Sequence, residues 1–447
     1  MSKLKSIKPN NYVCNNCGST FSTWSGRCER CGEWNTLELK ISNPTTSQGR
    51  SGLVVEPISQ SATFSERRIN SGIASVDSVF GGGLVEGSVS LLSGEPGMGK
   101  STLLLQLASA IAKNQSVLYV SGEESVHQLA ARAKRLGADQ HVFNVASNNS
   151  TEEIAGEILS AKYKLVIVDS IQTLRSAQIG STAGSVTQVT SSSALLSSAA
   201  KQSNTALLIV GHVTKDGNIA GPKLLEHAVD TVLSLEGDPT VGLKLLRVSK
   251  NRFGSTNETA IFEMRSNGLI PVLNPSALLL AERQISDGSI VLAAMEGSRP
   301  ILVEVQALVN TTSYGYPKRA ASGLDLGRLN LLLAMLERRT KLKLGDKDVY
   351  LNIVGGIKIT EPAADLAVVM AIASAAKAKQ LKANAVVFGE VGLSGEVRHV
   401  PGMAKRIAEA KQLGFDFAIG PKPLNAKPTP LLHPVSDVLS ALNTYLS

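Results

Sequence analysis

The sequence predicts an α/β fold divided among several domains, and three observations support this prediction. Short apolar runs alternate with helical stretches over residues 64–270, a glycine-rich loop occupies residues 94–101, and all four cysteines lie within the first 31 residues. Apolar runs between helical stretches are typical of buried parallel strands with crossover helices. We therefore expect strands at 88–92, 117–120, 164–168 and 206–210.

Chain length and composition indicate a globular protein with more than one domain. The 447 residues favour about three domains of roughly 150 residues each. Hydrophobic residues make up 43% and charged residues 18%, which leaves enough apolar material for sizeable cores and argues against disorder. The formal net charge of +8 favours a polyanionic partner such as nucleic acid without requiring one.

The N-terminus carries lysines but lacks the apolar stretch of a signal peptide or a membrane anchor. No window of the sequence approaches the roughly 18 apolar residues that a spanning helix needs. We therefore expect a soluble, cytoplasmic protein with no membrane partner. In that compartment clustered cysteines favour metal binding over disulfides.

Composition shifts divide the chain into segments. Residues 41–63 contain Ser, Thr, Pro, Gly and Gln with few large apolar groups, as expected for a linker. A Pro-bearing junction at 270–275 precedes a mixed segment with expected strands near 301–309 and 386–389 and expected helices near 326–337 and 363–376. The predicted segments are a metal-binding module at 1–40, the linker at 41–63, an α/β domain at 64–270 and an α+β domain at 271–447.

The four cysteines form two Cys-x-x-Cys pairs, each followed by a glycine. Cys14 and Cys17 are the first pair and Cys28 and Cys31 the second, with ten residues between the pairs. Two such turns can present four thiolates tetrahedrally to one Zn²⁺ ion. The alternatives are a redox pair or four unrelated core thiols. A closed four-cysteine site is structural, so we assign no catalysis to the zinc.

Residues 94–101 read Gly-Glu-Pro-Gly-Met-Gly-Lys-Ser, which fits the Walker A pattern of nucleotide-binding loops. The loop follows an apolar run and opens an expected helix at 100–112, which is the context that this motif requires. Backbone amides of the loop would surround the phosphates of ATP, Lys100 would neutralise the outer two, and Ser101 would bind Mg²⁺. The predicted nucleotide-binding residues are Gly94, Glu95, Pro96, Gly97, Met98, Gly99, Lys100, Ser101 and Thr102, together with Asp169.

Acidic residues follow two of the expected strands. Asp169 follows the run 165–168, where a Walker B carboxylate would hold the Mg²⁺ shell, although a turn residue is the alternative. Glu123 follows the run 117–120 and would polarise the attacking water, with Glu124 as its rival. Either glutamate could instead be a helix-terminal acid stabilised by the helix dipole. His212 could report the state of the γ-phosphate or be a histidine with satisfied hydrogen bonds.

The order of these motifs resembles the RecA-type core shared by recombinases and hexameric helicases. The pentapeptide Lys-Asn-Arg-Phe-Gly at 250–254 matches the signature of the bacterial RadA (Sms) recombination proteins. The four-cysteine module and a C-terminal segment similar to the Lon protease domain complete that architecture, so the resemblance covers the whole chain. It implies a RecA-like P-loop ATPase core with an N-terminal four-Cys zinc ribbon and a C-terminal Lon protease-like α+β domain.

The same resemblance implies a DNA-dependent ATPase that works with the recombinase RecA in recombinational DNA repair. Such a protein drives branch migration of strand-exchange intermediates as a homo-oligomeric, hexameric ring on single-stranded and branched DNA. The loops 176–193 and 214–223 would face the DNA, with Lys215 and Lys223 as contacts or as solvated surface lysines. Lys250 and Arg252 would reach across the subunit boundary to the nucleotide of a neighbour; the alternatives are surface residues in a turn or contacts to DNA phosphates.

The C-terminal segment departs from the Lon-type proteases, which use a Ser-Lys dyad. Ala363 stands at the serine position, and Arg406 takes the lysine position. Alanine carries no nucleophile and arginine stays protonated near neutral pH, so we expect no peptidase activity. The domain would then serve as a platform for assembly or DNA binding.

Three other function classes compare less well with the sequence than a DNA motor. A RecA-like ATPase switch that acts on protein partners is the first, and DNA-stimulated ATP turnover would separate it from the motor. An ATP-dependent protease is the second, and Ala363 argues against it. A purely structural zinc-binding adaptor is the third, and the complete nucleotide site argues against it.

Overall fold

The computed structural model describes residues 12–21, 25–39, 67–212, 224–237, 242–313, 315–381, 384–424 and 429–446. The chain divides into two compact units, Met1–Ser65 and Glu66–Ser447. The predicted linker at 41–63 lies outside the described residues. The boundary between the two larger domains at 270 and 271 stays a prediction.

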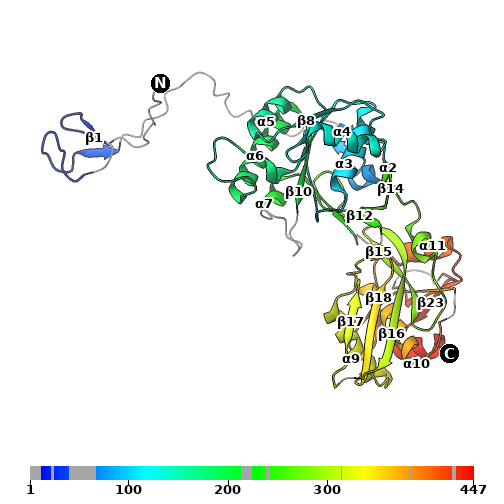
Figure 1. Ribbon diagram of the computed structural model, residues 1–447. Coiled ribbons are helices and arrows are strands. Elements are labelled where there is room, and N and C mark those ends of the chain that lie inside the picture. The colour runs from blue at the N-terminus through cyan, green and yellow to red at the C-terminus, as the bar shows by residue number, and fades with distance from the viewer. Residues whose placement is uncertain are drawn as a thin grey trace. The chain divides into compact units, whose positions relative to one another are not determined.

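The N-terminal unit contains a small antiparallel sheet with the strand order β2-β1-β3. Figure 1 labels its strand β1. Its strands are β1 (Tyr12–Cys14), β2 (Thr20–Phe21) and β3 (Leu37–Leu39). Cys14, Cys28 and Leu37 are buried at its centre, with partly buried aromatic rings against them. A core of this size is too small to stabilise a fold by burial alone, so the unit needs a further crosslink.

The second unit begins with β4 (Arg68–Ile69), α2 (Ala74–Val79) and β5 (Leu84–Val85), and then builds a nine-stranded sheet. The strand order in this sheet is β14-β13-β12-β11-β6-β10-β9-β7-β8. The strands are β6 (Val89–Gly94), β7 (Val117–Ser121), β8 (Asn144–Ser147), β9 (Leu165–Asp169), β10 (Ala206–His212), β11 (Thr231–Glu236), β12 (Leu243–Asn251), β13 (Thr259–Arg265) and β14 (Gly268–Pro271). The four strands expected from the sequence are β6, β7, β9 and β10, and each agrees within two residues.

The nine-stranded sheet has a parallel part and an antiparallel part. The six strands from β6 to β11 run parallel, and β12, β13 and β14 then alternate in direction. The carboxyl ends of the parallel strands therefore meet at one edge of the sheet, which is where ligands bind in open α/β folds. The end of β12 lies at the opposite edge, because β12 runs against β11.

Helices cover both faces of the sheet, because alternate side chains of the parallel strands are apolar on both sides. On one face, α2 and α3 pack on side chains such as Leu92, Tyr119 and Ile167. On the other face, α5 and α6 pack on side chains such as Leu91, Val120 and Val168. The helices of this domain are α3 (Lys100–Ala112), α4 (Val126–Arg135), α5 (Thr151–Leu159), α6 (Val186–Ser203) and α7 (Leu224–Ala228), with a 3-10 turn η1 (Ile171–Thr173). The observed α3 has the bounds that the sequence predicts.

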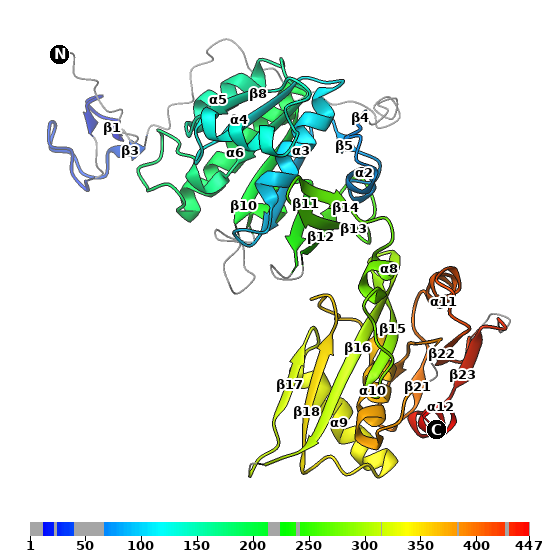
Figure 2. The same ribbon diagram turned by 45° about the vertical axis from the view of Figure 1, so that its right-hand side comes forward.

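The C-terminal part of the second unit is a seven-stranded mixed sheet with the order β17-β18-β16-β15-β19-β22-β23. Figure 2 shows β17, β18, β16 and β15 side by side. The strands are β15 (Ser289–Glu296), β16 (Arg299–Thr311), β17 (Arg319–Ser322), β18 (Lys347–Ile353), β19 (Ala385–Val387), β22 (Phe417–Pro421) and β23 (Leu432–Val435), with a separate pair β20 (Glu390–Val391) and β21 (Val397–Arg398). Strands and helices thus mix as expected for an α+β domain.

The central helix of this C-terminal domain is apolar on all sides. Ten consecutive residues of α10 (Asp365–Lys377), from Asp365 to Ser374, are buried, and the helix packs on β15 and β16. A helix that is apolar all round belongs in the interior of a domain. The other helices are α8 (Pro275–Leu280), α9 (Leu326–Thr340), α11 (Met403–Gln412) and α12 (Val438–Tyr445), with a 3-10 turn η2 (Pro362–Ala364) before α10.

A buried ion pair joins β12 of the nine-stranded sheet to β15 of the seven-stranded sheet. Arg247 Nη2 lies 2.7 Å from a carboxylate oxygen of Glu296, and Glu296 is buried. Burial raises the pKa of Glu296 to about 7; the guanidinium of Arg247 offsets part of this effect, and the carboxylates of Glu361 and Glu236 add to it. Ionising Glu296 therefore costs folding free energy despite its partner.

This raised pKa predicts how the stability of the second unit depends on pH. A carboxyl whose pKa is higher in the folded chain than in the unfolded chain stabilises the fold while it is protonated. Its contribution is therefore complete below the ordinary pKa of 4.5 and is lost as the pH rises through about 7. We expect Glu296→Gln, which stays neutral, to gain stability relative to the wild type over this interval, by on the order of 3 kcal/mol. Calorimetric unfolding at a series of pH values measures the difference.

The matched control is Glu236→Gln, because Glu236 also lies near Arg247 but its side chain is half exposed. That variant should follow the pH profile of the wild type much more closely. Parallel profiles for Glu296→Gln and the wild type would show that Glu296 does not titrate in this interval.

Candidate active site and metal centre

The glycine-rich loop connects the end of β6 to the start of α3. At two of its positions the backbone conformation and the close neighbours leave room only for glycine. Gly94 has a φ of +156°, and a Cβ atom there would lie 2.6 Å from the carbonyl oxygen of Leu235. Gly99 has a φ of +101°, and its Cβ would lie 2.5 Å from the Met264 side chain. The loop therefore exposes its backbone amides at the N-terminus of α3, where the helix dipole favours an anion.

Lys100 is the first residue of α3 and is only 5% exposed. Its Nζ donates hydrogen bonds to the carbonyl oxygens of Gly94 at 2.7 Å and Glu95 at 2.9 Å, so the ammonium lies across the loop. Burial lowers the pKa of Lys100, and the charges of Asp169 and Glu123 offset part of that effect. A buried cation over an amide-lined loop fits the phosphates of a nucleotide.

The remaining loop residues predicted to bind the nucleotide surround this cation. Glu95, Pro96 and Gly97 are exposed, whereas Met98 is buried. Ser101 and Thr102 lie in the first turn of α3 and are partly exposed. The role of Ser101 as a Mg²⁺ ligand stays a prediction.

The two predicted carboxylates lie at the same sheet edge as the loop. Asp169 ends β9 and is buried, and Glu123 follows β7, the neighbour of β9 in the sheet. Ser170 Oγ lies 3.0 Å from Glu123 Oε1, and His212 Nε2 lies 3.6 Å from the same oxygen. The ends of β6, β7, β9 and β10 thus bring together residues that are far apart in the sequence.

The structure separates the two rival glutamates. Glu124 forms an ion pair with Arg132 of α4 at 2.6 Å, so its carboxylate is directed to that helix. Glu123 lies beside Ser170 and His212 and acts electrostatically on Lys100. The geometry therefore favours Glu123 as the group that faces a bound nucleotide.

His212 is the last residue of β10, and one of its ring nitrogens is unsatisfied. Its Nδ1 is buried and has no hydrogen-bond partner within the part of the chain that the structure describes. A histidine placed only for packing and hydrogen bonding would satisfy both nitrogens. The neighbouring loop with Lys215 and Lys223 lies outside the described residues.

Tyr119 completes the set of side chains around Asp169, and the sequence analysis did not identify it. The Tyr119 hydroxyl donates a hydrogen bond of 2.6 Å to Asp169 Oδ2. Burial, and then the negative charge of Asp169, raise the pKa of Tyr119 well above its ordinary value, so the hydroxyl keeps its proton. A hydroxyl in the otherwise aliphatic run of β7 was the only sequence signal for this contact.

Lys250 and Arg252 lie at the opposite edge of the sheet. Lys250 Nζ donates to the carbonyl oxygens of Glu226, His227 and Val229, at 2.7, 3.3 and 2.8 Å, and so caps the C-terminal end of α7. Burial, followed by the positive charge of Arg252, lowers the pKa of Lys250. The ammonium is therefore fully engaged within its own chain.

Arg252 has a different environment, because its side chain is 55% exposed. One guanidinium nitrogen lies 3.1 Å from Asp230 Oδ1, and the other oxygen of Asp230 accepts a hydrogen bond from the amide of Val89. Val89 is the first residue of β6, whereas the Walker A loop follows its last residue. Arg252 is thus anchored at the end of β6 that is distant from Lys100.

The segment predicted to be the first DNA-facing loop, 176–193, is in part helical, because α6 begins at Val186. The remainder is held by the buried side chain of Gln188. Its amide nitrogen donates to the carbonyl oxygens of Ser176, Ile179 and Ser181 at 3.3, 3.0 and 3.1 Å. This loop is therefore ordered by its own helix.

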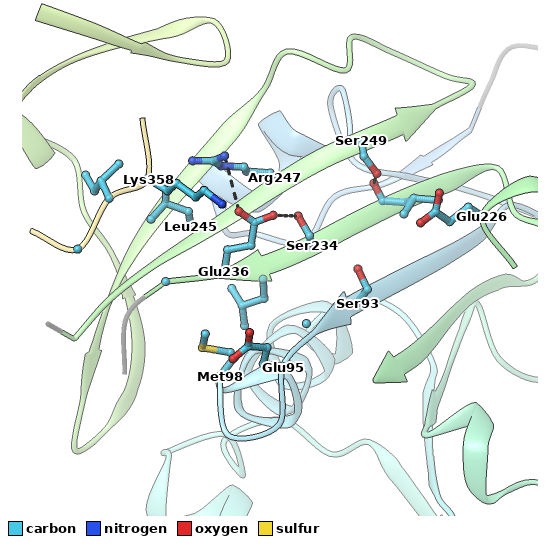
Figure 3. A pocket seen from close by; sticks show the side chains of 16 residues that line it. Ser93, Glu95, Met98, Glu226, Ser234, Glu236, Leu245, Arg247, Ser249 and Lys358 are labelled. Atoms are coloured by element: carbon cyan, nitrogen blue, oxygen red, sulfur yellow. Dashed lines mark hydrogen bonds and ion pairs between the residues drawn. The ribbon is translucent and has the colours of Figure 1, made fainter. Parts of the chain in front are cut away.

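A cavity of about 670 Å³ borders the Walker A loop on the side of β11 and β12 (Figure 3). Figure 3 shows Glu236 between Ser234 and Arg247: Ser234 donates to the carboxylate at 2.7 Å, and Arg247 lies 3.6 Å from it. Neither Lys100 nor Asp169 is among the residues that line the cavity. It is therefore a neighbour of the candidate nucleotide site and not its centre.

The four cysteines of the N-terminal unit converge on one point. Their sulfur atoms lie within 4.8 Å of one another, with Cys14 Sγ 3.6 Å from Cys31 Sγ and Cys17 Sγ 3.7 Å from Cys28 Sγ. Each pair closes the same turn, since the amide of Gly18 donates to Cys14 and that of Gly32 donates to Cys28. Sulfur atoms at about 2.3 Å from a tetrahedral Zn²⁺ are just under 4 Å apart, so this geometry fits zinc.

The positions of the Lon-type dyad are part of the buried core. Ala363 is buried, and Arg406 is fully buried with its guanidinium paired to Glu361 at 2.9 Å. Arg406 also donates to the carbonyl oxygens of Ala293 and Pro401. The arginine therefore joins α11 to the turn before α10 as a structural crosslink.

Comparison with known proteins identifies the family. A protein named DNA repair protein RadA from Haemophilus influenzae is 44% identical over 444 residues, which cover 96% of this chain and 97% of that protein. Proteins of the same name from Pseudomonas aeruginosa and Bacillus subtilis are 46% and 45% identical and cover 92% and 94% of this chain. The chain belongs to the RadA family. The sequence-based assignment to this family is thereby confirmed.

Family models match three parts of this RadA-family chain. Residues 12–38 match a rubredoxin metal binding domain, residues 56–218 an AAA domain and residues 333–423 subunit ChlI of Mg-chelatase. One solved ATPase domain aligns with 48% of the chain and 95% of its own length at 15% identity, with a TM-score of 0.41. The RadA relatives and the family models confirm the predicted fold: a RecA-like ATPase core, a four-Cys zinc ribbon and a Lon-like C-terminal domain. No helix among the described residues is long and apolar enough to span a membrane.

The four-thiolate geometry predicts one Zn²⁺ per chain, and Cys14→Ser should lose it. Removing one of four thiolates opens the tetrahedral site, and metal binding supplies the folding free energy of such a module. Elemental analysis of the purified protein measures the zinc content. Ser25→Ala is the control, because Ser25 lies in the same unit and its hydroxyl donates to the backbone carbonyl of Arg27 rather than to a cysteine. A full zinc content in Cys14→Ser would contradict a site made by all four cysteines.

Proposed function

We propose that this RadA-family chain is a DNA-dependent ATPase in homologous recombination and recombinational DNA repair. In this proposal it promotes branch migration of strand-exchange intermediates together with RecA, in the cytoplasm, as a ring-shaped, hexameric motor. The relatives named as DNA repair proteins support the repair role. The observation that carries the motor mechanism is the separation of the Walker A loop from Arg252 on opposite edges of one sheet.

Each residue at the loop edge has a role that follows from its position. The amides of the Walker A loop and the Lys100 ammonium bind and orient the phosphates of ATP. Ser101 and Asp169 hold Mg²⁺, which supplies charge neutralisation on the phosphates when it is bound. Glu123 orients and polarises the attacking water, and the unsatisfied His212 beside it is placed to respond to the γ-phosphate.

The cation that stabilises the transferred phosphoryl group is supplied by a neighbouring subunit in this proposal. Arg252 is bound to Asp230 at the start of β6, and the Walker A loop begins at its end. Through the register of β12, β11 and β6, Asn251 lies level with Ser90. From Ser90 to Gly94 the strand advances four residues, or on the order of 13 Å. Arg252 therefore cannot serve the nucleotide of its own chain, but it is exposed enough to serve the nucleotide of another.

Lys250 contributes differently, because its ammonium already caps α7. In our proposal it acts with Arg252 by holding α7 against the end of β12, which Arg252 directly follows. A direct catalytic role for Lys250 would require its ammonium to break its hydrogen bonds with three carbonyl oxygens. Arg252 is therefore the residue on which we base the trans-acting mechanism.

DNA is the polyanion that we propose for this basic chain, whose net charge is +8. The ordered loop 176–185 would contact the DNA strand near the centre of the ring.

We further propose that the C-terminal domain has no peptidase activity, since Ala363 offers no nucleophile and the Arg406 guanidinium is paired with the carboxylate of Glu361. The domain then contributes surface for assembly and for DNA.

Stimulation of ATP hydrolysis by DNA tests the motor directly. We expect single-stranded DNA to raise the ATPase rate, with a stimulation that weakens as salt increases because phosphate contacts release counterions. Lys100→Ala should abolish hydrolysis with and without DNA, since the phosphates lose their fixed cation. Hydrolysis by the wild type that DNA leaves unchanged would favour an ATPase switch on protein partners. Wild-type turnover in Lys100→Ala would overturn the nucleotide site.

Mixing two inactive variants tests the trans-acting role of Arg252. Arg252→Ala should bind ATP through its intact Lys100 yet hydrolyse it on the order of a thousandfold more slowly. Lys100→Ala should bind nucleotide badly but can offer its Arg252 to a neighbour. Mixed rings should therefore regain part of the activity.

Arg265→Ala is the matched control for this experiment, because Arg265 is similarly exposed and pairs with Glu263 on its own strand. It should hydrolyse ATP like the wild type. Normal hydrolysis by Arg252→Ala, or mixed rings that regain no activity, would exclude a cation supplied in trans.

A further inference from the structure

The buried hydroxyl of Tyr119 is the feature of the ATPase domain that the motifs do not account for. The residue has a relative exposure of 0% and lies in the middle of β7, among aliphatic side chains that pack under α3. Burying a hydroxyl costs free energy unless it finds a hydrogen-bond partner. Phenylalanine would fill the same space without this cost, so the partner of the hydroxyl is informative.

That partner is the Walker B carboxylate. The Tyr119 hydroxyl donates to Asp169 Oδ2 at 2.6 Å, which is short, as expected for a bond to a charged acceptor. The bond joins residues 50 positions apart in the sequence, and it exists because β7 pairs in parallel with β9. Asp169 itself is buried, so water competes little with Tyr119 for its carboxylate.

The backbone of Asp169 is fixed by the same strand end. The amide of Gly122, which follows β7, donates to the carbonyl oxygen of Asp169 at 3.0 Å. Strand β7 therefore holds both the main chain and one side-chain oxygen of the acid, while Oδ1 is not used by this contact. A carboxylate held in this way keeps Oδ1 for another partner, and its negative charge acts on the nearby Lys100.

We propose that Tyr119 is a positioning residue that orients the Asp169 carboxylate for Mg²⁺ in the nucleotide site. This inference rests on the proposed function, because it takes Asp169 to hold the Mg²⁺ shell. Groups that orient a metal-binding carboxylate typically change metal affinity about 10- to 100-fold when they are removed. The phosphate contacts of the Walker A loop do not involve Tyr119, so nucleotide binding without metal is independent of it.

The test compares nucleotide binding with and without Mg²⁺ in Tyr119→Phe, which keeps the ring and removes only the hydroxyl. Binding of a fluorescent ADP analogue is titrated first without divalent cation and then against MgCl₂. We expect affinity without Mg²⁺ to match the wild type, and the Mg²⁺ concentration for half-maximal effect to rise about 10-fold or more. An unchanged Mg²⁺ response would overturn the proposal, because a hydroxyl that only satisfies the core cannot alter it.

Two controls separate this result from other causes. Tyr163→Phe removes another tyrosine hydroxyl of the same domain, one that accepts a bond from Asn144, and it should leave the Mg²⁺ response unchanged. Absence of Mg²⁺-enhanced binding in the wild type would count against the proposed nucleotide site rather than against Tyr119. Should Tyr119→Phe not fold, Tyr119→Met takes its place, since methionine fills irregular core space and also lacks the hydroxyl. The same rise in the Mg²⁺ concentration for half-maximal effect is expected. An unchanged concentration would overturn the proposal.

Discussion

The direction of the strands in the nine-stranded sheet is the constraint on which the candidate site depends. Because β6, β7, β9 and β10 run parallel, their carboxyl ends meet at one edge and bring Lys100, Glu123, Asp169 and His212 together. None of these side chains would meet in an antiparallel arrangement of the same strands. The hydrogen bond from Tyr119 to Asp169 depends on the same parallel pairing.

The reversal of direction between β11 and β12 has the opposite consequence. It carries the end of β12 to the far edge of the sheet, where Asp230 binds Arg252 next to the first residue of β6. One subunit then presents a phosphate-binding loop on one side and an exposed cation on the other. In the proposed ring each cation serves the loop of a neighbour, so the fold itself would make hydrolysis depend on assembly.

Much of this could be predicted from the sequence, because the decisive motifs are local. The Walker A loop, the cysteine pairs and the apolar runs each lie within a few residues, and the fold that they indicate is the fold observed. What the sequence did not give are contacts set by register and direction. The bond from Tyr119 to Asp169 spans 50 positions, and the preference for Glu123 over Glu124 in our proposal rests on the ion pair of Glu124 with Arg132. The capping of α7 by Lys250 likewise follows from the pairing of β11 with β12.

The dependence of hydrolysis on assembly is the central claim of this account, and dilution of the wild-type protein tests it most directly. ATPase activity per subunit is measured over a series of protein concentrations, with the native mass determined at each. If Arg252 acts in trans, activity per subunit falls in parallel with the dissociation of the oligomer, while nucleotide binding through Lys100 persists. Undiminished activity per subunit in dissociated monomers would contradict the account.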